Sequence, residues 1–346
     1  MTRRTPAYFV CLAALGCGLG ACSNDDGDDA DLKTDAIIDT KAYVTGELEK
    51  LVTASEAIQK AAPAPDDDGW NPREDAQALE KMRSAWADAR DAYERVEGSI
   101  AILFEGLDIS TDERYDGFIE ADGDDDLFDG EGVTGMHAIE RILWAGDHPE
   151  HVLAFESALP NYKEAEFPSN EDEADGFKNE LAQRLVDDTK EMLQSFKPVA
   201  LDASTAYFGV IGSMEEQIEK VENAATAQDE SRYAQRTLAD MRANLEGGEK
   251  VYAAFSEWVK ADAGEDVDTK IMAGFRAIAR AYEANKGEAI PAVPDGFDVD
   301  DPSDADLDTP YGKLFHLLET EADTDSKSSL ASLMRQAADD MELEEE

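Results

Sequence analysis

Cysteine is nearly absent from this sequence and is confined to one end of it. Only three of the 346 residues are cysteines, at positions 11, 17 and 22. The rest of the chain therefore has no thiol for a disulfide, a thiolate metal site or a cysteine nucleophile. Histidine is also scarce, with four residues. Any metal site would have to combine these few imidazoles with carboxylate or carbonyl oxygens.

Basic residues are few as well. Lysine and arginine total 31 against 80 acidic residues, which gives a formal net charge of −49 at pH 7. Such a field repels phosphate backbones and anionic lipid headgroups, so we expect no nucleic-acid partner. The hydrophobic share of 42% is nevertheless sufficient to build a core. The sequence thus predicts a globular protein with an acidic surface and acidic loops.

Long hydrophobic runs are also missing. The apolar run from Ala7 to Leu15 is shorter than the ~20 residues that a membrane-spanning helix needs. It follows two arginines and precedes the small-residue segment Leu19–Cys22, which is the order of zones in a secretory signal. The ending Leu-Gly-Ala-Cys resembles the cleavage box of bacterial lipoproteins. An ordinary signal peptide with an incidental cysteine has the same zones and remains the alternative.

These features predict how the chain is delivered and anchored. We expect residues 1–21 to be a lipoprotein signal peptide, Cys22 to carry the lipid that holds the protein to a membrane, and residues 22–31 to form a flexible acidic tether. Ser23, directly after the cysteine, resembles lipoproteins sent to the outer membrane. We therefore expect a cell-envelope protein on the outer membrane, facing the periplasm.

No alternating strand pattern is present, and helical periodicity runs through most of the chain. The N-terminal half predicts one helix that ends before Pro63, a second from Pro72 to about Phe104, a loop over 105–131 and a short apolar helix over 133–146. The second helix carries apolar residues at steps of three and four, as in a bundle seam. These residues are Leu79, Met82, Trp86, Ala89, Tyr93, Val96, Ile100 and Leu103.

The C-terminal half has the same character. Its apolar patterns predict helices over 234–259, 267–285 and 311–341, the last broken near 323–325. We therefore predict an all-α fold of two packed antiparallel helical bundles with a cleft between them. The N-terminal bundle would comprise residues 32–199, including the short apolar helix, and the C-terminal bundle residues 200–346.

The short apolar helix carries the first candidate functional residues. His137 and Glu140 stand three residues apart on one face, among apolar neighbours. A carboxylate in such surroundings suffers a large desolvation penalty unless a partner compensates it. Either Glu140 forms a structural ion pair with His137 or an arginine, or both side chains are ligands of a cation.

A second acidic pair lies on the preceding long helix. Glu94 and Glu97 are also three residues apart, beside the seam. If the short helix packs on that flank, one imidazole and two or three carboxylates converge, which suits iron, manganese or zinc. The alternative is that both glutamates solvate a bundle edge and pair with Arg90 or Arg95.

Several segments resemble the imelysin family, which includes insulin-cleaving membrane proteases and EfeO/EfeM-type periplasmic iron-uptake proteins. Gly135-Met136-His137-Ala138-Ile139-Glu140, followed by Leu143-Trp144, matches the family's Gly-x-His-x-x-Glu motif. Other segments similar to family signatures are Tyr93–Glu97, Leu107–Arg114, Arg232-Tyr233 and Ala243–Gly248. Met136 departs from the usual aromatic residue, and Gly98 stands where the iron-uptake members often carry proline.

The resemblance implies a two-bundle helical fold and a metal ion bound by His137. By position its acidic partners would be Glu94, Glu97 and Asp112, with Glu140 as a ligand or as an orienting residue. The ion would be divalent or trivalent, with iron the first expectation and zinc the second. An inner-membrane iron transporter is the implied partner, and the cupredoxin-like domain of longer uptake proteins is not expected.

Three functions follow from these observations. The first is an envelope lipoprotein that binds a metal ion for iron acquisition, and we expect that ion to be iron. The second is an imelysin-type metallopeptidase, which needs an activated water and a general base. The familiar zinc-protease motif is His-Glu-x-x-His, whereas Ala138 follows His137 and Arg141 stands four residues on. The third is a polysaccharide-binding or structural envelope protein.

Overall fold

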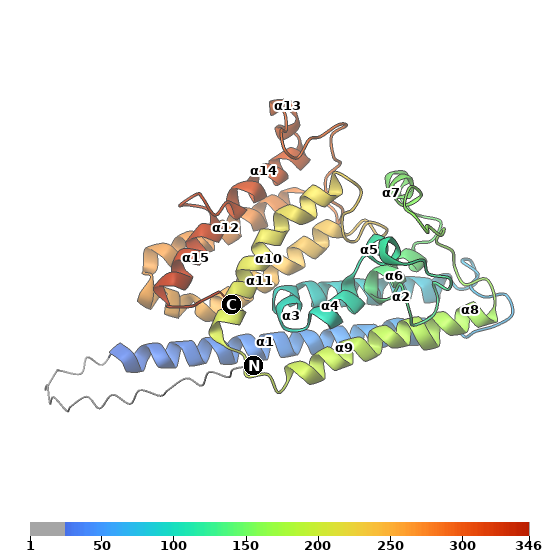
Figure 1. Ribbon diagram of the computed structural model, residues 1–346, viewed down its shortest axis with the longest axis horizontal. Coiled ribbons are helices and arrows are strands. Elements are labelled where there is room, and N and C mark those ends of the chain that lie inside the picture. The colour runs from blue at the N-terminus through green and yellow to red at the C-terminus, as the bar shows by residue number, and fades with distance from the viewer. Residues whose placement is uncertain (1–24, 346) are drawn as a thin grey trace, which may run out of the picture.

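A computed structural model describes residues 25–345, and in this part of the chain every regular element is a helix (Figure 1). The N-terminal half contains α1 (Asp25–Ala61), α2 (Ala76–Glu94), α3 (Glu97–Leu103), α4 (Glu105–Asp112), α5 (Tyr115–Ala121), α6 (Gly135–Leu143), α7 (Glu150–Glu156), α8 (Glu171–Gly176), a π-helical turn (Phe177–Leu181) and α9 (Ala182–Phe196). The C-terminal half contains α10 (Ala203–Ala224), α11 (Thr237–Asp262), α12 (Glu265–Ala284), α13 (Asp304–Leu307), α14 (Pro310–Ala322) and α15 (Leu330–Asp340). The predicted all-α fold is confirmed.

Two hydrophobic cores hold these helices. One is built from residues between 44 and 196, with α1, α2, α6 and α9 around it. The other is built from residues between 201 and 343, joined by Ala36 from the N-terminal part of α1. Helix α1 packs on α2 and α9 and also on α11 and α10, so in Figure 1 it underlies both groups of helices.

The predicted long helix over 72–104 is wrong at its start and in the middle, whereas its end near Phe104 is confirmed. Residues 71–75 form turns in which Asn71 Oδ1 accepts the backbone N–H of Arg73 at 3.0 Å, and α2 begins only at Ala76. Helical hydrogen bonding also stops after Glu94, and α3 starts anew at Glu97. Apolar spacing continues through this break, which explains why periodicity alone did not reveal it.

Close backbone contacts explain the break between α2 and α3. A Cβ atom on Gly98 would lie 2.3 Å from the carbonyl oxygen of Gly209 on α10, and one on Gly247 would lie 2.2 Å from that of Arg95. Helices α10 and α11 therefore approach the α2–α3 junction at distances that only glycine permits. The break lets two helices of the C-terminal half reach the residues around Glu94.

The predicted loop over 105–131 is also partly wrong. Residues 105–112 and 115–121 form α4 and α5, and only the remainder is irregular. Both helices are short and rich in acidic residues, so their apolar periodicity is too brief to detect. They matter because α4 carries Asp112 and lies against α6.

The N-terminal predictions fall mostly outside the described residues. The predicted signal peptide over 1–21 and the predicted lipidation site at Cys22 lie before Asp25, outside the described residues. Of the predicted tether over 22–31, the part from Asp25 onward is helical and belongs to α1. An acidic sequence is compatible with a helix start, since the helix dipole favours negative charge at that end. Between Asp25 and Glu345, no helix combines the length and the apolar character needed to cross a membrane.

Candidate metal centre

Helix α6 carries the Gly-x-His-x-x-Glu motif and is buried along its whole length. Its first residue, Gly135, has a φ of +85°, and a Cβ atom there would lie 2.5 Å from the carbonyl oxygen of Thr111. Glycine is required for both reasons, since other residues rarely adopt this conformation and a side chain would collide with α4. The motif's glycine thus lets the end of α4 lie against the start of α6.

His137 and Glu140 form a buried pair within this helix. The Nδ1 atom of His137 lies 2.8 Å from Oε2 of Glu140, and the two side chains are at most 1% exposed. The other oxygen of Glu140 accepts the backbone N–H groups of Tyr233 at 3.0 Å and Ala234 at 2.8 Å. Both oxygens of Glu140 are therefore partnered, and the loop before α11 holds them in place.

The second nitrogen of His137 has no hydrogen-bond partner. Nε2 is buried, and its nearest acidic atom is Oδ1 of Asp112 at 3.5 Å. His137 lines a small cavity of about 160 Å³ that opens to the surface. The other lining residues are Asp108, Ile109, Asp112, Glu113, Arg114 and Glu230. An unpartnered imidazole nitrogen and several carboxylates thus face one cavity.

Burial sets the protonation states of this pair. It lowers the pKa of His137 well below its usual range, with the positive charge of Arg90 adding to the effect. Burial likewise raises the pKa of Glu140 well above its usual range. When Glu140 is ionised and the imidazole is neutral, the proton on Nδ1 is donated to Oε2 of Glu140 and the lone pair is on Nε2. That lone pair is what a metal ion requires.

Glu94 and Glu97 lie in an adjoining charge network rather than on this cavity. Lys220 of α10 is buried, and its Nζ atom lies 3.1 Å from Oε2 of Glu94 and 2.9 Å from Oε2 of Glu97. Asn244 of α11 also donates to Oε2 of Glu97 at 2.5 Å. The two glutamates therefore already have a cation between them, supplied by the C-terminal half of the chain.

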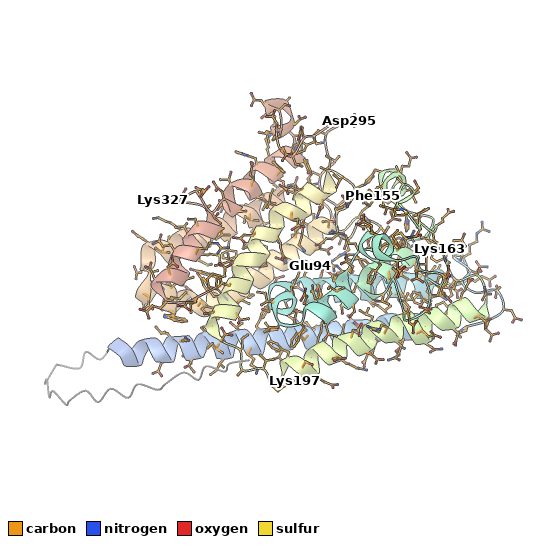
Figure 2. The ribbon with its side chains drawn as sticks, viewed as in Figure 1. Glu94, Phe155, Lys163, Lys197, Asp295 and Lys327 are labelled. Carbon is orange, nitrogen blue, oxygen red and sulfur yellow. The ribbon has the colours of Figure 1, made fainter. Side chains whose placement is uncertain are left out.

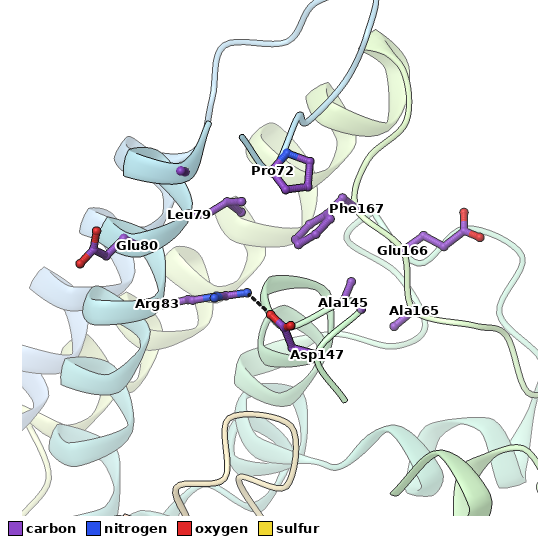
Figure 3. Close-up of a pocket in the computed structure, with 11 residues that line it drawn as sticks. Pro72, Leu79, Glu80, Arg83, Ala145, Asp147, Ala165, Glu166 and Phe167 are labelled. Carbon is purple, nitrogen blue, oxygen red and sulfur yellow. Dashed lines mark hydrogen bonds and ion pairs between the residues drawn. The ribbon is translucent and has the colours of Figure 1, made fainter. Parts of the chain in front are cut away.

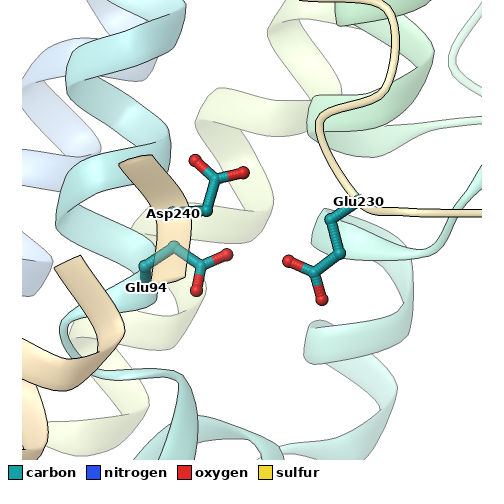
Figure 4. A group of neighbouring side chains, drawn as sticks. All are labelled: Glu94, Glu230 and Asp240. Atoms are coloured by element: carbon teal, nitrogen blue, oxygen red, sulfur yellow. The ribbon is translucent and has the colours of Figure 1, made fainter. Parts of the chain in front are cut away.

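Arg90 occupies the middle of the same network. Its guanidinium pairs with Asp112 and Glu94, and it lies 3.1 Å from Oε2 of Glu230 and 3.6 Å from Oδ2 of Asp240. Figure 4 shows the carboxylates of Glu94, Glu230 and Asp240 gathered together, with one oxygen from each within 4.8 Å of the others. Since Arg90 reaches all three, a metal ion among them would have to compete with a resident cation.

The two basic residues also keep part of the network ionised. Although burial opposes ionisation, the ion pairs with Lys220 and Arg90 hold the pKa of Glu230 below its usual range. Burial raises the pKa of Asp108 to about 6 despite the hydrogen bond from Tyr93. Glu230 is thus a carboxylate that faces both the cavity and the two cations. Because it is ionised and lines the same cavity as His137, Glu230 is the carboxylate best suited to share a metal ion with that imidazole.

Comparisons with known proteins identify the family and the fold of this chain. Residues 39–320 match the family model described as Imelysin (Peptidase_M75). The chain belongs to the imelysin family. A solved imelysin-like protein from Psychrobacter arcticum 273-4 has a similar fold, with a TM-score of 0.54 and 11% identity, over 94% of this chain and 98% of that one.

Curated relatives of this imelysin-family chain include the iron uptake system component EfeO of Escherichia coli (strain K12) and that of Shigella flexneri. Each is 26% identical over 285 residues, which is 82% of this chain and 61% of the relative. This chain thus spans about three fifths of the length of the curated relatives that it matches.

The structure brings together some of the predicted site residues and adds others. His137 and Asp112 line the cavity and Glu140 contacts His137 from behind, whereas Glu94 and Glu97 belong to the network around Lys220. Sequence analysis named Arg90 as an alternative partner of Glu94, and this pair is present, but it missed Glu230, Asp240, Asp108 and Lys220. Glu230 stands in an irregular segment two residues before the similar Arg232-Tyr233 signature, and that proximity was the one available signal.

A larger cavity lies elsewhere in this imelysin fold. It measures about 730 Å³ and is lined by residues of α2, the turn after α6 and the segment around Phe167 (Figure 3). Its charged groups include Arg83 and Asp147, which pair with each other at 3.3 Å. No histidine lines it. His137 lines the smaller cavity instead. Arg90 links Asp112 of that cavity to Glu94, which is labelled near the centre of Figure 2.

Proposed function

We propose that this chain is a metal-binding component of an iron-uptake system and that His137 binds the ion through Nε2. The observation that supports this most strongly is the state of His137. Its Nδ1 atom is held by Glu140, while Nε2 is buried, unpartnered and turned to an acidic cavity. A histidine whose second nitrogen is oriented by a carboxylate is the usual arrangement around protein-bound metals.

In this proposal the residues have distinct tasks. His137 and the carboxylates of Asp112 and Glu230 bind the ion, since all three line the cavity. Glu140 orients the imidazole and does not bind the ion, because both its oxygens are already used. Glu94 and Glu97 compensate the buried cations and so preserve the charge balance behind the ligands.

Iron is the proposed ion, and zinc is the second possibility. One imidazole with carboxylate oxygens is a donor set that suits iron, manganese or zinc, and no thiol is available after residue 22. The curated relatives carry the name iron uptake system component. That name refers to longer proteins, so its extension to this chain is part of the proposal.

The proposed setting is the cell envelope. A lipid on Cys22 would hold the chain to the outer membrane, facing the periplasm, and α1 would begin three residues after that anchor. An inner-membrane iron transporter would receive the ion. These assignments rest on the sequence signals and on the relatives' names.

Elemental analysis of the purified full-length protein tests the proposal. We expect one iron per chain, lost in His137→Ala and retained in the matched control His316→Ala, since His316 is an exposed histidine of α14. Metal-dependent cleavage of unfolded protein that is lost in His137→Ala would favour a metallopeptidase instead. If the protein neither retains iron nor cleaves unfolded protein, a polysaccharide-binding or structural envelope protein would be favoured.

A further inference from the structure

We propose that Arg114 forms an anion subsite beside the metal, so that the ion is bound together with a small oxygen anion of the carbonate or carboxylate class. This inference rests on the proposed function, because the anion is held by the metal and by Arg114 jointly. Arg114 lies between α4 and α5 and lines the same cavity as His137.

The guanidinium of Arg114 makes no hydrogen bond and no close ion pair within the described chain, although its charge helps to lower the pKa of Asp116. The residue is half-buried, its Nε atom is fully buried without a hydrogen bond, and none of the ion pairs found between residues 25 and 345 includes it. This is unexpected where acidic residues outnumber basic ones by 80 to 31. Even its neighbour Glu113 directs Oε1 to a backbone N–H, that of Arg114 itself, at 3.0 Å.

The other cations of this region behave differently. Arg90 and Lys220 are buried, and each pairs with at least three carboxylates. Those pairs compensate their charge within the protein. Arg114 differs because it faces the cavity and keeps its planar set of donors free. A guanidinium in this state is suited to a planar oxygen anion, which it can bind through two parallel hydrogen bonds.

The number of protein ligands leaves room for such an anion. The cavity offers one imidazole nitrogen and the nearby carboxylates of Asp112 and Glu230, fewer than the about six ligands of an octahedral oxygen-rich site. The remaining positions would be left for ligands that the protein does not supply. An anion there would complete the coordination sphere with two oxygens and turn its remaining charge toward Arg114.

The acidic lining makes this anion dependent on the metal. Asp108, Asp112, Glu113 and Glu230 line the cavity, and their summed charge opposes any anion in an empty site. A bound trivalent or divalent ion reverses the local sign. Metal and anion should therefore enter together, which would separate this subsite from an ordinary surface anion site.

Co-retention of iron and a labelled anion by the full-length protein tests the inference. The protein is loaded with ferrous sulfate in air in the presence of either [14C]bicarbonate or [14C]citrate, and iron and label are counted after gel filtration. The arm in which label is retained shows whether the anion is carbonate or a carboxylate. In that arm we expect one labelled anion per iron, and no label when iron is left out.

Arg114→Gln should lose the label and weaken iron retention at least about tenfold, because the two-donor contact is gone. Arg114→Lys should be intermediate, since it keeps the charge but not the planar fork. Arg276→Gln on α12, an exposed arginine distant in sequence, is the matched control and should behave as wild type. Unchanged far-ultraviolet circular dichroism and thermal midpoint establish that the variants are folded.

Three results would overturn the inference while leaving the proposed function standing. They are iron bound through His137 with no label in either arm, label retained equally by Arg114→Gln, and label retained without iron. Failure of the wild-type protein to retain iron under any condition would overturn the proposed function, and this inference with it.

Discussion

At the scale of single residues, Glu140 controls which nitrogen of His137 is free. Its Oε1 atom accepts two backbone N–H groups, from Tyr233 and Ala234, so only Oε2 remains for the imidazole. When Glu140 is ionised, Oε2 accepts the proton of Nδ1, and Nδ1 is then the protonated nitrogen. The unpartnered Nε2 atom is therefore a consequence of how the loop before α11 holds the glutamate.

Glu140→Gln tests this control with almost no change in size. The amide oxygen must still accept the two backbone N–H groups, so the NH₂ group faces Nδ1 and forces the imidazole proton onto Nε2. We expect metal affinity to fall about 10–100-fold, as for other residues that orient metal ligands. Competition titration measures the affinity, and ¹⁵N NMR of the histidine reports the tautomer.

The matched control is Glu319→Gln on α14. It alters a His–Glu pair of the same spacing, His316 and Glu319, which is exposed and 3.4 Å apart. Affinity equal to wild type in Glu140→Gln, with the Nδ1-protonated tautomer retained, would contradict the assigned role of Glu140.

At this scale the sequence predicted the residue types of the candidate site but only some of its residues. His137 and Glu140 share a helix, so their spacing alone placed them together. Glu230 and Arg114 lie in irregular segments, and their position depends on how distant parts of the chain pack. Nothing in the local pattern distinguishes such residues from solvated loop charges.

At the scale of elements, the crossing of α3 and α10 positions both halves of the charge network. Gly98 and Gly209 face each other there, and a Cβ atom on either would lie 2.3–2.4 Å from the carbonyl oxygen of the other. The two backbones are in direct contact. This contact fixes the position of α10 relative to α2, and therefore places Lys220 within ion-pair distance of Glu94 and Glu97.

Gly98→Ala should therefore destabilise the protein by about 1–3 kcal/mol, the usual cost of overpacking, or more if α10 cannot shift. Gly212→Ala on the same α10 is the control, because nothing lies within 4 Å of a Cβ atom there. It should instead stabilise by about 0.5–1 kcal/mol through helix propensity. Urea unfolding of both variants measures the difference, and equal effects would contradict the close crossing.

Element prediction succeeded where apolar periodicity was long and failed where it was short or misleading. The helix predicted over 234–259 corresponds to α11, which begins at Thr237 and ends at Asp262, whereas α4 and α5 were missed because each has only seven or eight residues. The break between α2 and α3 was also missed. It depends on the glycine contacts with α10 and α11, which no local pattern contains.

At the scale of the whole molecule, buried ion pairs join the two groups of helices. Lys220 of α10 pairs with Glu94 and Glu97 of the N-terminal half. Because Lys220 is buried, the loss of either pair would cost more free energy than the loss of a surface pair. Removing one partner of a buried pair leaves uncompensated charges behind. The junction that carries the candidate metal centre is thus also a main electrostatic contact between the halves.

Lys220→Gln should destabilise the folded protein by about 3–5 kcal/mol. Lys190→Gln is the control, since Lys190 pairs with Glu56 across the partly exposed surface of α9 and α1, and such pairs contribute about 0–1 kcal/mol. Urea unfolding measures both values. A loss below 1 kcal/mol in Lys220→Gln would show that the halves do not depend on this pair.

The central claim concerns where the metal binds, and a crystal structure of the iron-loaded protein with anomalous scattering at the iron edge tests it most directly. The account predicts one peak in the cavity at about 2.0–2.2 Å from Nε2 of His137, with Asp112 and Glu230 beside it. A peak among Glu94, Glu230 and Asp240 with Arg90 displaced, or no peak near His137, would contradict it.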